Sequence, residues 1–373
     1  MSLFTKFFGS STAAASGERS PIDIITNRVT ARPANATWLS ILLGTMGREN
    51  SGKTALQMAM DIAVLGQYLQ SGLSISAAGN DGLSMTPLDV NTRLKKTFYR
   101  LRQLMPGGGG LPTTLAVTPV NYVLCEGEQA RLQLLASEEI GQVISRTDSD
   151  STPEELNQYH DFLGRFANSD VKHIIVSPPS RHPSALSEAQ WKQDMIEYGA
   201  YLNESLRKSK VPVTSVAIVI SKIDTLYESA DAARAALSHE ALKECVRPLV
   251  RAIEASPRIK YGAIIPTSVF GFGQAVSVAE PVFEEDESDK FDLGIQDARS
   301  HEEGFALRKD SAIEPFNVQA LVLWSLLAGA LPKEVDVGNG QDEPALARVC
   351  RMLSHDLKSI NGWIVPVKGD LVG

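Results

Sequence analysis

The stretch Gly47-Arg-Glu-Asn-Ser-Gly52-Lys53-Thr54 follows an apolar run at residues 38–43 and fits the pattern G-x-x-x-x-G-K-[ST]. Glycines let the backbone curl so that successive N–H groups point at phosphate oxygens, and a helix that begins here adds the positive end of its dipole. Lys53 supplies a point charge for terminal phosphates, and the Thr54 hydroxyl is placed to bind Mg²⁺. We therefore expect a nucleotide site at Gly47, Asn50, Ser51, Gly52, Lys53 and Thr54; the alternative is a glycine-rich turn beside a surface lysine.

The composition limits what else this chain can be. It has 373 residues, of which 43% are hydrophobic, and a formal net charge of −8. This acidic balance argues against a general nucleic-acid-binding protein, which would carry a basic excess. Three isolated cysteines fit no metal-binding spacing and are typical of a reducing compartment. The most apolar run is too short to span a bilayer, so we expect a cytoplasmic protein with no transmembrane segment.

Strand-like and helix-like segments alternate after the loop. Nearly continuous apolar runs, at 38–43, 171–176, 215–220 and 263–265, are typical of strands buried on both faces of a parallel sheet. Residues 117–124 and 130–135 flank a short turn and predict an antiparallel hairpin. Segments with helical patterns are placed at 54–69, 91–105, 187–208, 230–256, 317–331 and 343–360. This alternation predicts a three-layer α/β fold with a mostly parallel sheet.

The domain organisation follows from the same pattern. Residues 1–20 are expected to be a disordered tail, because most of them are small or polar. Residues 21–332 form the predicted phosphate-loop domain, with a helical and loop insert at about 71–110. Within the insert, residues 71–89 are rich in Gly and Ser and are expected to be a loop; the following helix places Leu94, Phe98, Leu101 and Met105 on one face. Residues 333–373 are expected to be a helix and a tail.

Two segments are suited to recognise a base. Ser221-Lys222-Ile223-Asp224 follows the strand at 215–220. A carboxylate at a strand end can accept hydrogen bonds from N1–H and the exocyclic amino group of guanine, a donor pair that adenine lacks. The stem of Lys222 can lie along the flat base. Ser268 and Val269 follow the strand at 263–265, where a turn can present N–H groups to the guanine oxygen.

Two more segments are suited to Mg²⁺ and water. A threonine before the hairpin, Thr113 or Thr114, could close over the metal and the terminal phosphate, becoming ordered only with a triphosphate. After the second hairpin strand comes Glu138-Glu-Ile-Gly141-Gln142. The Gly141 amide can bind the terminal phosphate, and Gln142 can orient the attacking water.

In this order, the five segments resemble the motifs of P-loop GTPases of the TRAFAC class. The closer resemblance is to a bacterial branch of Ras-like GTPase-domain proteins, with a helical insert, a hairpin leading to D-x-x-G, a strand ending in T-K-x-D and a late helix N-V-x-x-P-x-x-W-x-L. The serine turn appears here as Ser268-Val-Phe-Gly-Phe-Gly273, and the late helix as Asn317-Val-Gln-Ala-Leu-Val-Leu-Trp324-Ser-Leu. The resemblance covers roughly residues 38–331 and implies the Ras-like form of the P-loop NTPase fold.

The resemblance also implies a function. It implies a switch protein that binds GTP or GDP with Mg²⁺ and hydrolyses GTP slowly. It implies metal contacts from Thr54, Thr113 or Thr114 and Glu138, and catalytic roles for Lys53, Gly141 and Gln142. Relatives of this architecture often occur in multi-gene systems, so a protein partner is implied by analogy.

Two departures from the family pattern fall on the chemistry. Glu138 stands where the family has Asp, and Ser221 stands where it has Asn or Thr, a change expected to weaken tethering of the loop more than base selection. Nucleotide binding is therefore expected more firmly than hydrolysis. A pseudo-GTPase that serves as a nucleotide-stabilised interaction module is the alternative, and a P-loop ATPase is a third interpretation.

Overall fold

The computed structural model describes residues 39–48, 51–77, 87–102, 119–137, 162–178, 188–272, 275–277, 305–307, 313–334 and 345–371. All of them belong to one compact unit, Thr37–Gly373. The tail expected at residues 1–20 lies outside the described residues. In this described part of the chain, no helix is both long enough and apolar enough to cross a membrane.

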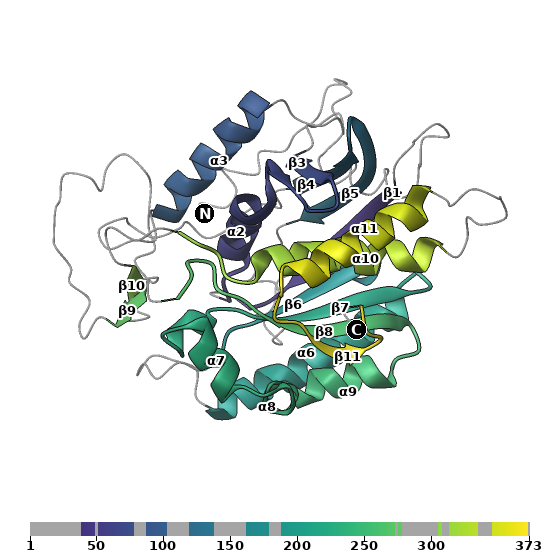
Figure 1. Ribbon diagram of the computed structural model, residues 1–373. Coiled ribbons are helices and arrows are strands. Elements are labelled where there is room, and N and C mark those ends of the chain that lie inside the picture. Colours follow the sequence, from purple (N-terminus) through teal and green to yellow (C-terminus); the bar gives the residue numbers. More distant parts are fainter. Residues whose placement is uncertain are drawn as a thin grey trace, which may run out of the picture. The chain divides into compact units, whose positions relative to one another are not determined.

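Within the described residues, a nine-stranded mixed sheet has the order β11-β8-β7-β6-β1-β5-β4-β3-β2 (Figure 1). Parallel pairings join the central strands, which are β1 (Leu39–Met46), β5 (Gln129–Ser137), β6 (Val171–Val176), β7 (Thr214–Ile220) and β8 (Ile259–Pro266). Antiparallel pairings add β4 (Pro119–Glu126), β3 (Leu73–Ala77) and β2 (Gln67–Tyr68) at one edge and β11 (Val365–Lys368) at the other. A separate two-stranded ribbon pairs β9 (Ala275–Ser277) with β10 (Phe305–Leu307).

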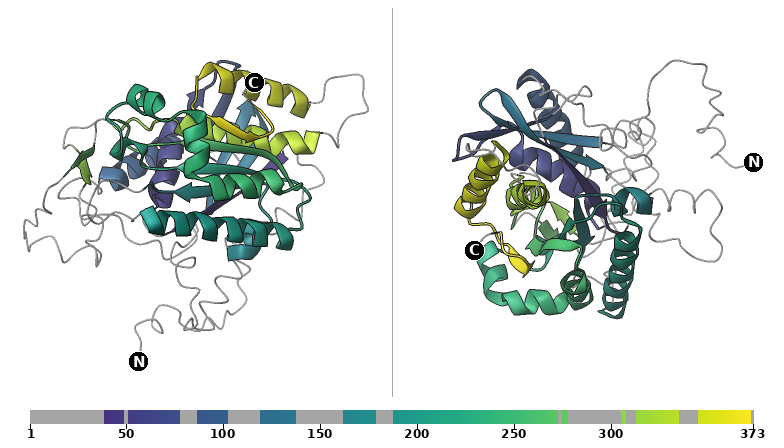
Figure 2. Two further views of the ribbon diagram at one scale, coloured as in Figure 1. Left: turned by 90° about the horizontal axis from the view of Figure 1, so that it is seen from below. Right: turned by 90° about the vertical axis from the view of Figure 1, so that its right-hand side faces the viewer.

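Alternate residues of the central strands enter two hydrophobic cores, one on each face of the sheet. In β7, Ala217 and Val219 belong to one core, whereas Val216, Ile218 and Ile220 belong to the other. The first core is covered by α2 (Lys53–Val64), α10 (Val318–Glu334) and α11 (Ala345–Ser359), and the second by α6 (Glu188–Lys208), α7 (Ala230–Ala236), α8 (His239–Cys245) and α9 (Arg247–Ala255). Figure 2 shows α10 and α11 on one side of the strands and α6 and α9 on the other. The predicted three-layer α/β fold is confirmed.

The strand order also indicates where a ligand binds. β1 pairs on one side with β5, which is the next parallel strand in the chain, and on its other side with β6, which follows β5. The chain therefore changes sides at β1, which makes this strand a topological switch point of the sheet. In open α/β sheets, ligands bind outside the carboxyl ends of the strands at such a switch point. Residue 47 follows the carboxyl end of β1 directly, so the phosphate-loop motif lies at this position.

The structure corrects the expectations for two segments near the phosphate loop. The helix expected at 54–69 ends at Val64, because Leu65 is extended and Gly66 has a φ of 73°. The loop expected at 71–89 contains β3 in its first part, where Leu73 and Ile75 are buried and the serines between alternate with them. The period of two residues was present in the sequence but was obscured by the surrounding glycines and serines.

The structure defines two further segments more closely than the sequence does. The helices expected at 230–256 are three, because Ser229 and Ser238 each accept a backbone N–H and begin α7 and α8. The tail expected after residue 360 contributes β11, which pairs with β8. The helix expected at 343–360 is confirmed as α11.

Candidate nucleotide-binding site

The phosphate loop connects β1 to α2, and two of its described positions require glycine for different reasons. A Cβ atom on Gly47 would lie 2.5 Å from Ser51 Oγ and 2.9 Å from the carbonyl oxygen of Ile175, so only glycine fits there. Gly52 precedes α2 with φ 87° and ψ 18°, in the left-handed region that favours glycine. Glu49 and the predicted site residue Asn50 lie outside the described residues.

Lys53 lies against the inside of this loop. Its Nζ donates to the carbonyl oxygens of Gly47, at 2.7 Å, and of Arg48, at 2.6 Å. Ser51 is buried, and among the described residues its Oγ atom has no hydrogen-bond partner. A cation held in the loop and an unpaired buried hydroxyl beside it are groups that a phosphate oxygen can satisfy.

The segment at 221–224 contacts the phosphate loop directly. The Ser221 hydroxyl lies 2.8 Å from the carbonyl oxygen of Ser51 and 3.2 Å from that of Val176, and shares its hydrogen between them. Lys222 has a φ of 57°, and its Cε lies 4.0 Å from the position that a Cβ atom on Gly52 would take. Serine at position 221 therefore still connects the end of β7 to the loop, although the sequence led us to expect a weaker tether.

Asp224 lies in a short 3₁₀ helix, Ile223–Thr225, and forms a hydrogen bond with Ser268. Burial raises the pKa of the Asp224 carboxyl above its usual value, although the Ser268 hydrogen bond and the charge of Lys222 oppose that shift. Ser268 and Val269 are both buried directly after β8. The backbone of Ser268 pairs with Phe316, and its Oγ accepts the Gly271 N–H over 2.9 Å. The structure thus brings together both segments that were predicted to recognise a base.

The other predicted site residues cannot be placed in this way. Thr113, Thr114, Glu138, Gly141 and Gln142 lie outside the described residues. Thr54, in the first turn of α2, follows Lys53. Among the described side chains, no group of three or more His, Cys, Asp or Glu residues is placed to hold a metal ion. Of the residues predicted to hold Mg²⁺, the structure describes Thr54 alone.

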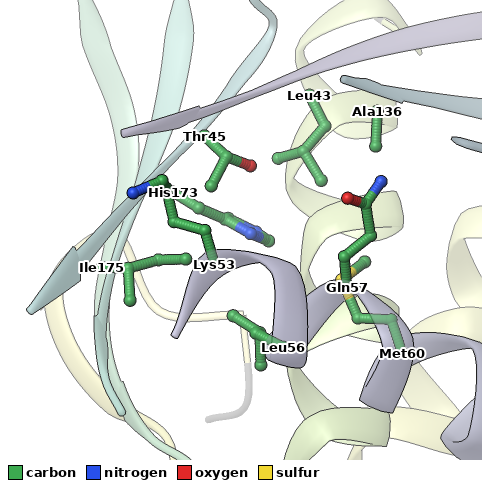
Figure 3. A pocket seen from close by; sticks show the side chains of 9 residues that line it. All are labelled: Leu43, Thr45, Lys53, Leu56, Gln57, Met60, Ala136, His173 and Ile175. Atoms are coloured by element: carbon green, nitrogen blue, oxygen red, sulfur yellow. The ribbon is translucent and has the colours of Figure 1, made fainter. Parts of the chain in front are cut away.

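A small cavity lies beneath the loop, between β1, α2, β5 and β6 (Figure 3). Its volume of about 20 Å³ is large enough for one water molecule and too small for a nucleotide. Gln57 Nε2, at its wall, has no hydrogen-bond partner among the described residues. His173 also lines the cavity; its Nε2 lies 2.7 Å from Ser325 Oγ, and burial lowers its pKa to about 3. This neutral histidine is therefore part of the packing below the site.

Sequence reasoning did not identify one residue of the site, Arg48. Its Nη2 atom lies 2.9 Å from Asp194 Oδ1 and 2.6 Å from Glu197 Oε2, both on α6. The motif leaves this position unspecified, and α6 begins far along the chain. No local pattern in the sequence connects the two.

No family model and no curated protein matches this chain. Solved structures do match. They include SsGBP in complex with GDP (14% identity, covering 66% of this chain and 50% of that one, TM-score 0.30). Another is elongation factor SelB from Methanococcus maripaludis with the GTP analogue GppNHp (12% identity, covering 63% of this chain and 31% of that one, TM-score 0.29). A third is the SRb-GTP/SRX complex of the signal recognition particle receptor from Chaetomium thermophilum (16% identity, covering 64% of this chain and 94% of that one, TM-score 0.32). The chain spans half or less of the SsGBP and SelB chains. At TM-scores this low, the likenesses carry no argument about function.

Proposed function

We propose that this chain is a guanine-nucleotide-binding switch protein of the TRAFAC class of P-loop GTPases. The observation that carries the proposal is the contact of Ser221 Oγ with the Ser51 carbonyl oxygen, at 2.8 Å. It connects the segment that contains Asp224 to the loop that contains Lys53. A carboxylate with a fixed position relative to a phosphate-binding lysine can select the base and hold the phosphates of one ligand.

The roles follow from the donors and acceptors of each group. Lys53 and the loop amides hold the phosphates, and Asp224 accepts from N1–H and the amino group of guanine. Thr54, Thr113 or Thr114 and Glu138 hold Mg²⁺, which when bound neutralises charge on the phosphates. Gly141 contacts the terminal phosphate, and Gln142 orients the water. The proposed activity is slow hydrolysis of GTP to GDP and phosphate, carried out together with protein partners.

Replacement of Asp224 by asparagine tests the base assignment. Asp224→Asn removes the charged acceptor, so GTP affinity should fall by roughly tenfold to a hundredfold. Its amide can instead donate to the additional oxygen of xanthine, so affinity for XTP should rise. Isothermal titration with GTP and XTP measures both. Asp231→Asn, at an exposed aspartate in the first turn of α7, is the matched control. Unchanged GTP affinity in Asp224→Asn would show that this carboxylate does not recognise guanine.

A pseudo-GTPase is the second candidate function, because Glu138 stands where the family pattern has Asp. A single-turnover assay with γ-labelled GTP and Mg²⁺ separates the two. Cleavage that is lost in both Lys53→Met and Gln142→Leu supports hydrolysis and excludes a module without turnover. Binding without cleavage, also when cellular partners are added, supports the pseudo-GTPase. Competition between ATP and GTP in the same assay tests the ATPase alternative.

A further inference from the structure

Arg48, in the phosphate loop, is attached to α6 by both its side chain and its backbone. Its guanidinium group contacts Asp194 and Glu197, as described above. Its peptide N–H donates to the hydroxyl oxygen of Tyr198 over 2.8 Å. We call Arg48, Asp194, Glu197 and Tyr198 the α6 clamp.

The carbonyl group of the same residue holds Lys53. The Arg48 oxygen accepts from Lys53 Nζ at 2.6 Å and from the Ser51 N–H at 3.2 Å. The Arg48 N–H belongs to the same peptide unit as the Gly47 carbonyl group, whose oxygen accepts from Lys53 Nζ at 2.7 Å. The position of the phosphate-binding ammonium is therefore linked to α6 through this peptide unit. Because a peptide unit is planar and stiff, a displacement of the Arg48 N–H also displaces the Gly47 carbonyl group.

The α6 clamp is partly buried, and its helix is fixed in the fold. Asp194 and Tyr198 are each 3% exposed, whereas the side chains of Arg48 and Glu197 are 26% and 34% exposed. The contacts of Arg48 with Asp194 and Tyr198 are therefore better shielded from water than its contact with Glu197. The α6 helix is itself fixed in two ways. Trp191 Nε1 donates to the carbonyl oxygen of Cys245 over 3.2 Å. Tyr198 and Leu202 pack in the hydrophobic core on this face of the sheet. Loss of the Tyr198 hydroxyl would leave the Arg48 N–H without this acceptor.

We propose that the α6 clamp is a positioning device that fixes Lys53 for the terminal phosphates of the nucleotide. This rests on the proposed function and adds a control point to it, because α6 then sets how tightly the terminal phosphates are held. Arg48, Asp194 and Tyr198 act through Lys53 and are positioning residues. A partner that shifts α6 thereby changes the rate of nucleotide release.

The experiment compares Tyr198→Phe with a matched control on the same helix, Ser205→Ala. The Ser205 hydroxyl donates to Leu202 within α6. Dissociation constants for GTP, GDP and GMP are measured by titration calorimetry, and amide hydrogen exchange is measured on the nucleotide-free proteins. Tyr198→Phe should lower the affinity for GTP and GDP by roughly tenfold. Its affinity for GMP, which lacks the terminal phosphates, should be nearly unchanged. It should also speed exchange at Ser51, Gly52 and Lys53 but not in β7. Asp194→Asn, which removes a charge and keeps the shape, should act in the same direction.

Each outcome decides the proposal. An equal loss of affinity for GTP, GDP and GMP, or no loss of affinity for any of them, overturns the proposal, because the clamp would then be a structural contact only. Faster exchange throughout β7 overturns it for the same reason. If the unmodified protein binds no guanine nucleotide, the proposed function fails, and the exchange data alone decide whether the α6 clamp fixes the loop. Unchanged exchange at Ser51 to Lys53 in Tyr198→Phe then overturns the positioning role of the clamp. Faster exchange confined to these residues supports it.

Discussion

Lys172 is the most deeply buried charged side chain described for the sheet. Its exposure is 0%, and its Nζ donates to the carbonyl oxygens of Ala167 and Ser169 and to Thr214 Oγ1, over 3.2, 2.8 and 3.1 Å. Ala167 ends a helical turn, so its carbonyl group lies at the negative end of the helix dipole. Burial lowers the pKa of Lys172 to about 7, although the charge of Asp170 partly opposes this.

This lysine makes stability depend on pH. In the unfolded chain its pKa has the ordinary value of about 10.4. Between pH 7 and pH 10, the unfolded chain therefore holds a proton that the folded chain lacks, so the free energy of unfolding should rise with pH, by up to about 1.4 kcal/mol per pH unit. The variant Lys172→Met lacks this contribution. Urea unfolding of both proteins at pH 7, 8, 9 and 10 measures the difference, and parallel curves would contradict a lowered pKa.

Individual site residues were predictable only where their chemistry is local. The spacing of Gly47, Gly52 and Lys53 specifies a loop conformation, because the backbone must curl within a few residues. The burial of Lys172 could not be predicted in this way, because the apolar residues on either side of it in the sequence are the same whether its side chain is buried or exposed. The partner of Arg48 was out of reach for another reason: Tyr198 lies 150 residues away in the chain. Only the packing of α6 brings the two together.

At the scale of the element, α3 (Pro87–Arg102) is held on α2 by one polar network. Asp61 accepts from Arg93 Nε at 2.8 Å and Nη2 at 2.5 Å, from Tyr122 Oη at 2.8 Å, and from Thr97 Oγ1 at 3.2 Å. Burial and the charge of Asp61 raise the pKa of Tyr122, so its phenol stays protonated and can donate. A single carboxylate thus joins α2, α3 and β4.

This network explains why the predicted face of α3 was only partly right. The sequence placed Leu94, Phe98 and Leu101 together, and Leu101 is buried, but Phe98 is 37% exposed. Thr97 is buried in its place. The hydrogen bonds to Asp61 rotate the helix so that polar residues face inward, and hydrophobic periodicity alone cannot predict that. Met105 lies outside the described residues.

Replacement of Asp61 by asparagine should loosen α3. The amide keeps the shape but removes the charge that pairs with Arg93, and such losses in buried pairs cost about 3 kcal/mol. Hydrogen exchange should accelerate in α3, and the free energy of unfolding should fall. Asp356→Asn, at a buried carboxylate of α11 that accepts from Ser71, is the control and should leave exchange in α3 unchanged. Unchanged exchange in α3 of Asp61→Asn would show that packing alone holds the helix.

At the scale of the whole sheet, the central strands were predictable and closure of the second edge was not. Continuous apolar runs and the hairpin predicted the central strands, since burial on both faces imposes that composition. β11 has four residues, of which one is fully buried, so its pattern resembles a loop. It is recognisable as a strand only from its pairing with β8.

Asn317 joins this edge to the turn that follows β8 and contains Ser268. Its Nδ2 donates to the carbonyl oxygens of Pro266 and Trp363, both at 2.8 Å, and its Oδ1 accepts the Trp363 N–H at 2.9 Å. It also takes a φ of 61°, which asparagine tolerates better than most residues. One side chain therefore links the end of β8, the start of α10 and the chain that leads into β11.

Replacement of Asn317 by aspartate should destabilise the whole sheet edge. Aspartate keeps the size and the tolerance for positive φ, but it has no N–H to offer and brings a charge against two carbonyl oxygens. Buried acceptors left unpaired in this way should lower the free energy of unfolding by about 2–4 kcal/mol. Urea denaturation of the variant and the unmodified protein measures this difference. Asn361→Asp is the matched control, because Asn361 has a similar φ of 48° and is exposed. Because Pro266 lies directly before the segment with Ser268, hydrogen exchange should also accelerate at Ser268 and Val269 in Asn317→Asp. A variant as stable as the control would show that β11 is held by its pairing with β8 alone.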